Sequence, residues 1–391
     1  MFDYNLKWVE TEEERAAVYR FRYEMYVEGQ SLFKDEADHE NRLLFDDYDR
    51  TGKTAIAICE GKAVGTMRLN IGTDTTFSDP CREIYKMNVF DGCLEDHEIA
   101  IATRLMVLPE LRGSMLSLQL HWMLYEWAAS QGVEVVLGNC EPHLINGYRK
   151  LGWRPHGKVA NHVSNRLVVA ICVVTGDFPY LESIKCPLLP ALRQRTKATD
   201  KVPAIVERVM ADVPVYSAIP QQEDLYVNNI KAALGEIKGQ LADIFHDQDE
   251  AMTLLAKSNI LHCDANQNLI VHGHASQTLY LLLDGSLNIC QNGKVLVAVT
   301  EYGALVGEVA FFSQSRRMAD VVTGPQGATV LALSVSTLNQ LMSDYSVVAS
   351  RFLHFVVTQL CTKLHERSVS QSDAVKALIS GLTTGLKKPQ P

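Results

Sequence analysis

The 391-residue chain lacks any apolar run long enough to cross a lipid bilayer. Its longest unbroken apolar run, Leu167 to Val174, falls well short of the roughly 20 residues that a spanning helix needs. The chain begins Met-Phe-Asp-Tyr-Asn, with no basic segment leading into an apolar stretch, so no export signal is visible. These absences predict a cytoplasmic protein without a transmembrane segment.

Patterned cysteines and an excess of positive charge are also missing. The nine cysteines include no CxxC pair, which favours free thiols over disulfides or a zinc site, so no metal is expected. The formal net charge of −9 disfavours nucleic-acid binding over the molecule as a whole. Hydrophobic residues at 47% and charged residues at 21% are ordinary for globular protein. A chain of this length exceeds one ordinary core, so two domains are expected.

Residues 1–185 have the pattern of a mixed α/β domain. Thr11 and Glu14 form a capping signal that predicts a helix ending near Val27. The strands predicted from β-rich runs cover about 54–59, 63–70, 98–108, 133–137 and 167–174. Further helices are predicted at about 115–130 and 144–151.

Residues 186–250 change character and are predicted to be a helical linker. Five prolines precede a helix at about 223–245, whose apolar residues alternate spacings of three and four. This seam fits either a homodimeric coiled coil or packing against a neighbouring domain.

The pattern from 251 onward is all-β. Strand-like runs at about 269–272, 279–283, 287–290, 295–299 and 329–333 are separated by Gly, Asn and Asp turns. A helix at about 347–367 and a tail at 368–391 follow, and the helix offers a second route to a homodimer. The predicted fold is therefore α+β, with an N-terminal α/β domain, a linker and a C-terminal β-roll with flanking helices.

The segment GEVAFFSQSRRMADV at 307–321 has the chemistry of a cyclic phosphate site. A buried phosphate needs a cation and several N–H donors, and a glycine lets the backbone approach it closely. Arg317 supplies the cation, and Glu308 can accept a ribose 2′-hydroxyl. A helical turn at 309–312 would point amide groups at the anion. The candidate residues are Gly307, Glu308, Val309, Ala310, Arg317 and Met318.

With the strand–glycine turns around it, the stretch at about 250–367 resembles cyclic-nucleotide-binding domains, which implies cAMP or cGMP as ligand. Met318 stands where that family usually has a small residue, which bears on ligand fit and on the choice of base. The alternative is a β-roll that has lost its ligand. Too few residues follow for a helix-turn-helix module, so no nucleic-acid partner is expected.

LMVLPELRGSM at 105–115 and GYRKLGW at 147–153 resemble two motifs of the GNAT acyltransferase superfamily. The first combines a strand, an Arg-Gly turn and a helix N-terminus, which together can hold an anionic donor. Its donor-binding residues would be Leu105, Val107, Arg112, Gly113 and Ser114. The second motif implies Tyr148 as the acid that protonates the leaving thiolate, unless Tyr148 only fills the core.

Four upstream segments narrow the resemblance: FRYEMYVE (21–28), DDYD (46–49), GTMRL (65–69) and TRLMV (103–107). In this order they resemble acyl-homoserine-lactone synthases and long-chain N-acyl amino acid synthases. The resemblance implies an acceptor pocket whose ion pairs position a charged amine. The pocket residues would be Arg22, Asp46, Asp49, Arg68 and Arg104. The alternative is a purely structural salt-bridge network.

Two departures from the family patterns bear on the chemistry. Met115 and Ser117 replace glycines of the phosphate turn and would crowd a CoA pyrophosphate, which favours acyl carrier protein over acyl-CoA as donor. A basic face of Arg112, Arg149, Lys150 and Arg154 would dock this acidic carrier. The synthases' strand glutamate aligns with Ile101, so Glu98 or His97 nearby could deprotonate the amine, and a water relay or an already neutral amine would also serve.

The sequence therefore predicts an N-acyltransferase that joins an acyl group from a thioester to a small amine or amino acid, under regulation by a cyclic nucleotide. Two alternatives stay open. One is a cyclic-nucleotide-regulated protein-lysine acetyltransferase, and the other is a catalytically inactive sensor or scaffold.

Overall fold

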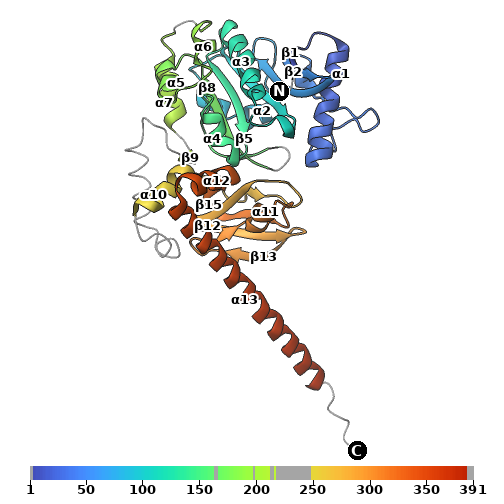
Figure 1. Ribbon diagram of the computed structural model, residues 1–391, viewed down its shortest axis with the longest axis vertical. Helices are drawn as coiled ribbons and strands as arrows, with labels where there is room; N and C mark the ends of the chain where they lie inside the picture. The colour runs from blue at the N-terminus through green and yellow to red at the C-terminus, as the bar shows by residue number, and fades with distance from the viewer. Residues whose placement is uncertain (1–2, 163–165, 197–198, 212–214, 217–247, 385–391) are drawn as a thin grey trace, which may run out of the picture.

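The computed structural model describes residues 3–162, 166–196, 199–211, 215–216 and 248–384. Figure 1 shows two stacked bodies with a long C-terminal helix leaving the second body. The predicted helix at 223–245, with its coiled-coil seam, lies outside the described residues. No helix among the described residues combines the length and apolarity that membrane crossing requires.

The N-terminal body is built on one mixed sheet in the order β1-β2-β3-β4-β5-β8-β6, with β7 paired to β8. Its strands are β1 (Asn5–Trp8), β2 (Lys53–Cys59), β3 (Lys62–Ile71), β4 (Ile99–Val107), β5 (Val135–Cys140), β6 (Arg154–Pro155), β7 (Ala160–Asn161) and β8 (Leu167–Val174). Apolar side chains of these strands pack against α3 (Met115–Ser130), which forms because Ser114 caps its first turn.

The other helices of this body are short. They are α1 (Glu12–Arg22), which continues as a π-helical turn at Tyr23–Glu28, α2 (Asp79–Ile84), α4 (Ile145–Arg149), α5 (Phe178–Ser183), α6 (Leu189–Arg193) and α7 (Val202–Ala211). Short 3-10 turns lie at Asp47–Asp49, Met87–Phe90, Asp96–Glu98, Pro109–Leu111 and Pro142–Leu144. The predicted capping box of Thr11 and Glu14 is confirmed at the start of α1.

The first part of the predicted linker belongs to this body by its packing. Leu188, Ala191 and Leu192 join the core that α3 covers. Ile205 and Val209 of α7 are fully buried against the opposite face of the sheet. The N-terminal core therefore extends past residue 185 into α7, because these apolar faces find their partners there.

The C-terminal body is an antiparallel β-roll in the order β13-β12-β15-β10-β9, with β11 on β15 and β14 on β12. Its strands are β9 (Val215–Tyr216), β10 (Asn259–Cys263), β11 (Asn268–Ile270), β12 (Thr278–Gln291), β13 (Lys294–Val299), β14 (Leu305–Val306) and β15 (Asp320–Ser334). The helices are α10 (Gln248–Lys257), α11 (Glu308–Ser313), α12 (Val335–Asp344) and α13 (Ser346–Thr384).

The α+β fold prediction is confirmed, with two differences in this body. The runs predicted as separate strands at 279–283 and 287–290 form one strand, β12, because Asp284 and Gly285 stay paired with β15 between two bulges, one on either side of them. The helix predicted to end near residue 367 continues to Thr384, so most of the predicted tail is helical. In Figure 1 this helix, α13, projects away from the rest of the molecule.

The two bodies share one continuous apolar cluster. It joins Val159 and Leu167 of the N-terminal body to β-roll residues such as Leu269 and Ile270. Asn161 and Asn268 add two hydrogen bonds across the boundary, of 2.7 and 3.1 Å. The bodies therefore meet through a packed interface, and this interface borders both candidate sites described next.

Candidate functional sites

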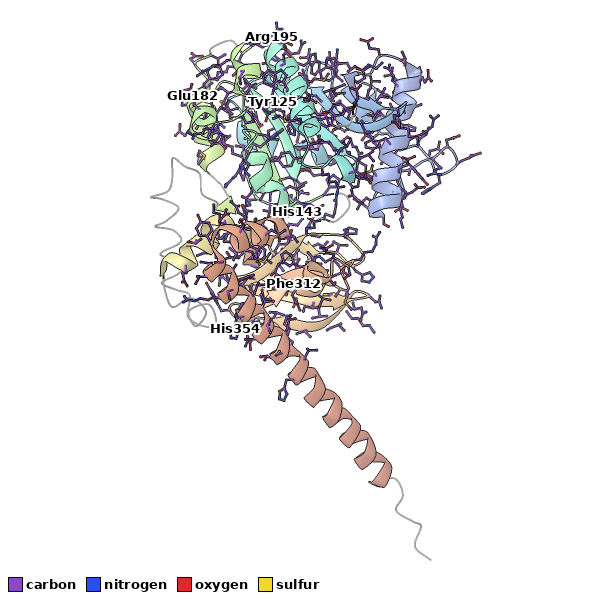
Figure 2. The ribbon with its side chains drawn as sticks, in the orientation of Figure 1. Tyr125, His143, Glu182, Arg195, Phe312 and His354 are labelled. Atoms are coloured by element: carbon purple, nitrogen blue, oxygen red, sulfur yellow. The ribbon has the colours of Figure 1, made fainter. Side chains whose placement is uncertain are left out.

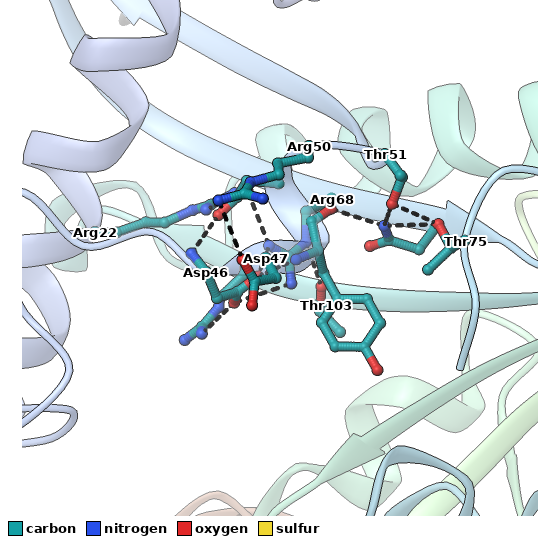
Figure 3. A network of polar contacts seen from close by, with 12 residues as sticks. Arg22, Asp46, Asp47, Arg50, Thr51, Arg68, Thr75 and Thr103 are labelled. Carbon is teal, nitrogen blue, oxygen red and sulfur yellow. Dashed lines mark hydrogen bonds and ion pairs between the residues drawn. The ribbon is translucent and has the colours of Figure 1, made fainter. Parts of the chain in front are cut away.

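The five predicted acceptor residues form one ion-pair network, drawn in Figure 3. Asp49 Oδ1 lies 2.7 Å from Arg22 Nη1 and 2.8 Å from Arg68 Nη1. Asp46 receives the second Arg68 contact at 2.5 Å and Arg104 Nη2 at 2.7 Å. The two carboxylates thus alternate with three guanidinium groups, and segments far apart in the sequence meet at one point.

Local backbone structure places each member of this network. Asp46 and Asp49 form a capping box at the start of the 3-10 turn at 47–49, since Asp46 accepts from the Tyr48 amide and Asp49 accepts from the Asp46 amide. Arg104 sits where β4 bulges against β3, and its φ of 56° is in the left-handed region. Such strain at a non-glycine residue is typical of sites where a side chain is aimed for function.

The network carries an excess of one positive charge, from three arginines against two aspartates. Burial opposes ionisation of Asp46, but Arg68 and Arg104 outweigh it and hold the pKa of that carboxyl well below its usual range. Arg22 is fully buried, and its Nε and Nη2 have no hydrogen-bond partner among the described residues. An anionic group of a ligand would satisfy this excess.

Aromatic rings flank the outer end of the network, and the sequence analysis did not identify them. The Arg104 guanidinium lies 4.5 Å from the Phe33 ring centroid and 5.5 Å from that of Tyr26. Phe33 in turn meets the His162 ring edge-on at 5.8 Å. Burial, together with Arg166 and Arg104, lowers the pKa of His162 to about 4, so this imidazole is neutral at neutral pH.

The donor motif begins on β4, beyond the point where β4 stops pairing with β5. Strands β4 and β5 pair in parallel only at Ile99–Ile101 with Val135–Leu137, and no further pairing joins them among the described strands. Leu105 and Val107 lie on β4 beyond this point and are half-buried. The diverging strands leave backbone N–H and C=O groups facing the gap, which an amide-bearing arm can pair with.

The Arg-Gly turn that follows leads directly into α3. Gly113 has a φ of 79°, and the Ser114 hydroxyl accepts a hydrogen bond from the Leu116 amide at 3.3 Å. Arg112 is exposed, as is Met115, whose exposed fraction is 60%. Met115 is the first residue of α3, whose N-terminus is the kind of position at which a pyrophosphate binds.

Tyr148 lies on α4, beside α3. Its ring meets His121 at 5.9 Å and Trp153 at 5.9 Å, both edge-on. The hydroxyl of Tyr148 makes no hydrogen bond within the described part of the chain, and burial raises the pKa of the phenol. The ring therefore packs in an aromatic cluster while its hydroxyl stays protonated and uncommitted, so both interpretations of Tyr148 describe part of its environment.

Glu98 and His97 are not brought to the acceptor network. Glu98 is engaged by the Glu95 amide at 2.9 Å and by the Lys201 ammonium. It precedes β4, six residues before Arg104, which is roughly 20 Å along an extended strand. Its part is to anchor α7 through Lys201, and His97 is exposed. The prediction of a base at these positions therefore has no support in the geometry.

The predicted basic face loses one member. Arg154 is buried, paired with Asp177 at 2.5 Å, and lies over the Tyr180 ring at 4.3 Å. It holds α5 to the sheet. The exposed cations beside the donor motif are Arg112 and Lys150, with Arg149 half-buried.

The predicted nucleotide residues surround the start of α11. Gly307 has a φ of 83°, and a Cβ there would lie 2.3 Å from the Arg317 Nη1, so glycine is required for both reasons. Arg317 is only 3% exposed, which excludes the interpretation of it as a surface residue. It donates to the Gly307 carbonyl at 2.8 Å, to Ser276 Oγ at 3.2 Å and to the Thr278 carbonyl.

The other predicted nucleotide-binding residues differ in the exposure of their side chains. Glu308 is paired with Lys363 of α13 at 3.0 Å, a contact that the sequence analysis missed. Ala310 is buried, whereas Val309 and Met318 are exposed, the latter by 66%. This stretch thus combines the buried Arg317 and a partly buried Glu308 with two exposed apolar side chains.

Two protein-family models match the chain. N-acyl amino acid synthase FeeM matches residues 17–172, and the cyclic nucleotide-binding domain matches residues 260–345. No curated protein matches the sequence significantly.

Three solved structures, each similar to a part of the chain, are two synthases and a cyclic nucleotide-binding domain. A CoA-dependent acyl-homoserine lactone synthase, BjaI, with MTA is 20% identical, covers 52% of this chain and 99% of its own, and has a TM-score of 0.39. FeeM, an N-acyl amino acid synthase from uncultured soil microbes, is 16% identical, with 50% and 96% covered and a TM-score of 0.36. A cyclic nucleotide-binding domain from Methylobacillus flagellatus is 22% identical, with 37% and 81% covered and a TM-score of 0.31.

Proposed function

Since the chain combines an acyltransferase domain of the N-acyl amino acid synthase type at 17–172 with a cyclic nucleotide-binding domain at 260–345, we propose that it acylates the amine of a small amino acid under control of a cyclic nucleotide. The acyl group comes from a thioester. Three parts of the molecule support this proposal. They are the ion-pair network, the end of the pairing between β4 and β5, and the surroundings of Arg317.

The observation that carries the acceptor proposal is the positive excess of the network, at an end that solvent reaches. Asp46 and Arg104 have side-chain exposures of 28% and 14%, while Arg22 and Asp49 are closed off. A zwitterionic amino acid presents an ammonium for Asp46 and a carboxylate for Arg104. An amine that has no carboxylate offers only the contact to Asp46 and leaves the excess positive charge of the network uncompensated.

A cavity of about 230 Å³ borders Asp49 and is lined by Arg15, Tyr19, Lys53 and Trp127 among others, whereas Asp46 and Arg104 do not line it. The preference for a free amino acid over the lysine side chain of a folded protein therefore rests on the charges of the network.

The reaction proceeds by direct attack. The ammonium of the bound amino acid first loses a proton to solvent, the neutral amine nitrogen adds to the thioester carbonyl, the C–S bond breaks, and an amide N–C bond forms. Tyr148 donates its phenolic proton to the leaving thiolate and regains a proton from solvent, and the second proton lost by the amine also passes to solvent. Tyr148 is protonated at neutral pH, as an acid must be, and burial raises its pKa further, which makes its proton harder to lose.

Mass spectrometry of lipid extracts from cells that overexpress the protein tests the activity. We expect N-acyl amino acids that are missing from cells expressing the Arg104→Met variant, in which the guanidinium is removed but the length is kept. Extracts indistinguishable from those of the empty vector would reject the synthase proposal.

The donor is proposed to be an acyl carrier protein in preference to acyl-CoA. Met115 stands at the helix N-terminus that a CoA pyrophosphate would use, and Arg112 and Lys150 offer exposed positive charge to an acidic carrier. One acyl chain on both carriers should be transferred faster from the protein carrier, at a rate that falls with salt. Lys150→Glu should raise KM for the protein donor alone. Equal, salt-insensitive use of both donors would contradict this.

The nucleotide part of the proposal is tested by calorimetry with cAMP and cGMP. Arg317→Ala should weaken binding by a factor of at least about 100, since a charge-assisted phosphate contact contributes about 3 kcal/mol. The neighbouring Arg316, which donates to the Gly273 carbonyl at 2.9 Å from an exposed position, gives a matched control. Arg316→Ala should bind normally. No heat from the wild-type protein with either nucleotide would reject the sensor.

A further inference from the structure

The segment that carries Tyr148 lies directly on the β-roll. Asn146 Nδ2, two residues before Tyr148, donates to the Lys257 carbonyl at 3.0 Å, at the end of α10. The turn before α4, at Pro142–Leu144, packs against β15. Figure 2 places His143 of this turn at the junction of the two bodies. Movement in the β-roll at this point is therefore transmitted to α4 by direct contact.

A charge cluster occupies the same junction. Glu141 Oε1 lies 2.5 Å from Arg166 Nη1, and both side chains are largely buried, with exposures of 17% and 20%. Glu141 also lies 3.6 Å from His143, but burial lowers the pKa of His143, which leaves Arg166 as the charged partner at neutral pH. These residues belong to the N-terminal body: Glu141 directly follows the end of β5, and Arg166 directly precedes the start of β8.

Glu141 also acts on the phosphate-site arginine of the other body. Burial lowers the pKa of Arg317, and three groups oppose this effect: Tyr280, Glu141 and Glu308. Among the groups named, Glu141 is the one that comes from the N-terminal body. Glu141 thus pairs with Arg166 on its own side of the interface, next to the turn at Pro142–Leu144 that packs against β15, and its charge acts on Arg317 across the interface.

A cyclic phosphate changes this balance. When its negative charge lies on Arg317, the attraction between Arg317 and Glu141 is cancelled and a repulsion between Glu141 and the phosphate is added. Because the pair is shielded from solvent, salt screens these interactions little. By linkage, any arrangement of the 141–149 segment that moves Glu141 away favours nucleotide binding, and nucleotide binding favours that arrangement equally.

The Glu141–Arg166 pair also reaches the acceptor network. The Arg166 carbonyl accepts a hydrogen bond from the His162 amide at 2.8 Å. The His162 ring meets Phe33, on which Arg104 stacks. The Glu141–Arg166 pair is therefore connected to both parts of the transfer site. One chain of contacts leads through α4 to Tyr148, and the other leads through His162 to Arg104.

We propose that Glu141, held by Arg166, is the positioning residue that couples phosphate binding at Arg317 to the acyl-transfer site. The inference rests on the proposed function, because it names the route by which the nucleotide regulates the transferase. Nucleotide binding displaces the 141–149 segment, and the position of Tyr148 relative to the acceptor network changes with it.

Two substitutions test the coupling by the sign of their effects. Glu141→Gln removes the charge that repels the phosphate and should tighten cAMP or cGMP binding about 5-fold. Arg166→Gln leaves Glu141 with Arg317 as its remaining cation and should weaken binding by a similar factor. General loosening of the interface would shift both affinities in one direction. Lys158→Gln, which removes the exposed interdomain pair with Asp264 at 3.4 Å, is the matched control and should change neither.

Calorimetry of the full-length variants gives these affinities, and thiol release from the acyl thioester gives the response of the transfer rate to nucleotide. We expect that response to be lost in Glu141→Gln and kept in Lys158→Gln. A response that persists unchanged in Glu141→Gln, or affinity shifts of equal sign in both variants, overturns the inference alone. Wild-type protein that binds the nucleotide without any change in transfer rate rejects the proposed regulation itself, and the coupling with it.

Discussion

Asp46 and Asp49 provide a test of whether the ion-pair network is structural, functional or both. They lie three residues apart, and each contacts two arginines, yet Asp49 is closed from solvent while Asp46 is not. We predict that Asp49→Asn mainly lowers stability and that Asp46→Asn mainly lowers activity.

The magnitudes follow from burial. Asp49 is the carboxylate that neutralises Arg22, and both side chains are closed off, with exposures of 4% and 0%. Removing one charge of a buried pair costs about 3–5 kcal/mol, and about 3 is expected because Asn keeps a hydrogen bond. Asp46 is partly solvated, so its loss should cost about 1 kcal/mol of stability. If Asp46 receives the acceptor ammonium, kcat/KM should fall roughly 100-fold, which corresponds to one charge-assisted contact.

Thermal denaturation and steady-state kinetics with the acceptor together separate the two roles. Asp49→Asn should lower Tm by about 10 °C, and Asp46→Asn should lower it by a few degrees. Equal stability losses with unchanged kinetics in Asp46→Asn would refute the functional role and leave a structural network. A small Tm change in Asp49→Asn would refute the burial argument.

The pH dependence supplies a second readout of the same pair. The folded-state pKa of both carboxyls lies below the ordinary value of about 3.9, because the arginines outweigh the burial that opposes ionisation. Their stabilisation is therefore complete above about pH 5 and is lost as the pH falls through the depressed folded pKa. Asp49→Asn should make the domain less stable at pH 7 and less sensitive to acid than the wild type.

Three further predictions concern other parts of the molecule. Tyr148→Phe should lower kcat about 100-fold with donor KM nearly unchanged, as measured by thiol release; an unchanged kcat would leave Tyr148 as a core residue. Phe33→Leu should raise the acceptor KM about 5-fold, since the Arg104 stacking contributes about 1 kcal/mol. Gly307→Ala should abolish nucleotide binding in calorimetry because its Cβ would meet Arg317, and retained affinity would show that α11 adjusts.

Local sequence rules predicted much of the N-terminal fold. The helix at 115–130 and the strand at 167–174 match α3 and β8 because each is bounded by a strong signal, a serine cap in one case and a pure apolar run in the other. The strands of the β-roll were harder to predict from the sequence. Asp284 and Gly285 have turn chemistry, but in the structure Gly285 lets β12 approach β15 so closely that a Cβ would lie 2.3 Å from the Gly327 carbonyl. Glycine there marks a bulge within a strand, which local rules cannot distinguish from a turn.

The residues of the two candidate sites were predictable where they belong to a sequence motif. The residues of the acceptor network were found through their order along the chain, although they converge only in the folded protein. Phe33 and Lys363 were missed because nothing near them in the sequence indicates a partner, and their contacts to Arg104 and Glu308 arise from tertiary packing. Arg154 was misplaced for the converse reason. A charged residue next to a motif was expected at the surface, yet Asp177 and Tyr180 make its burial favourable.

The residues that the sequence does not reveal include those at which the two domains meet. Each domain's own chemistry can be read from its motifs, but the junction depends on residues such as Glu141, Asn146 and Arg166, which belong to no motif of either domain. If Arg317 binds the phosphate as proposed, the charge on the other side of the interface becomes part of the binding energy. The acyltransferase domain then responds to the ligand only to the extent that its own residues interact differently with the free and the phosphate-bound Arg317. In the proposed coupling Glu141 sets the sign and size of the regulation, so a substitution there changes the regulation without altering the motif residues at either site.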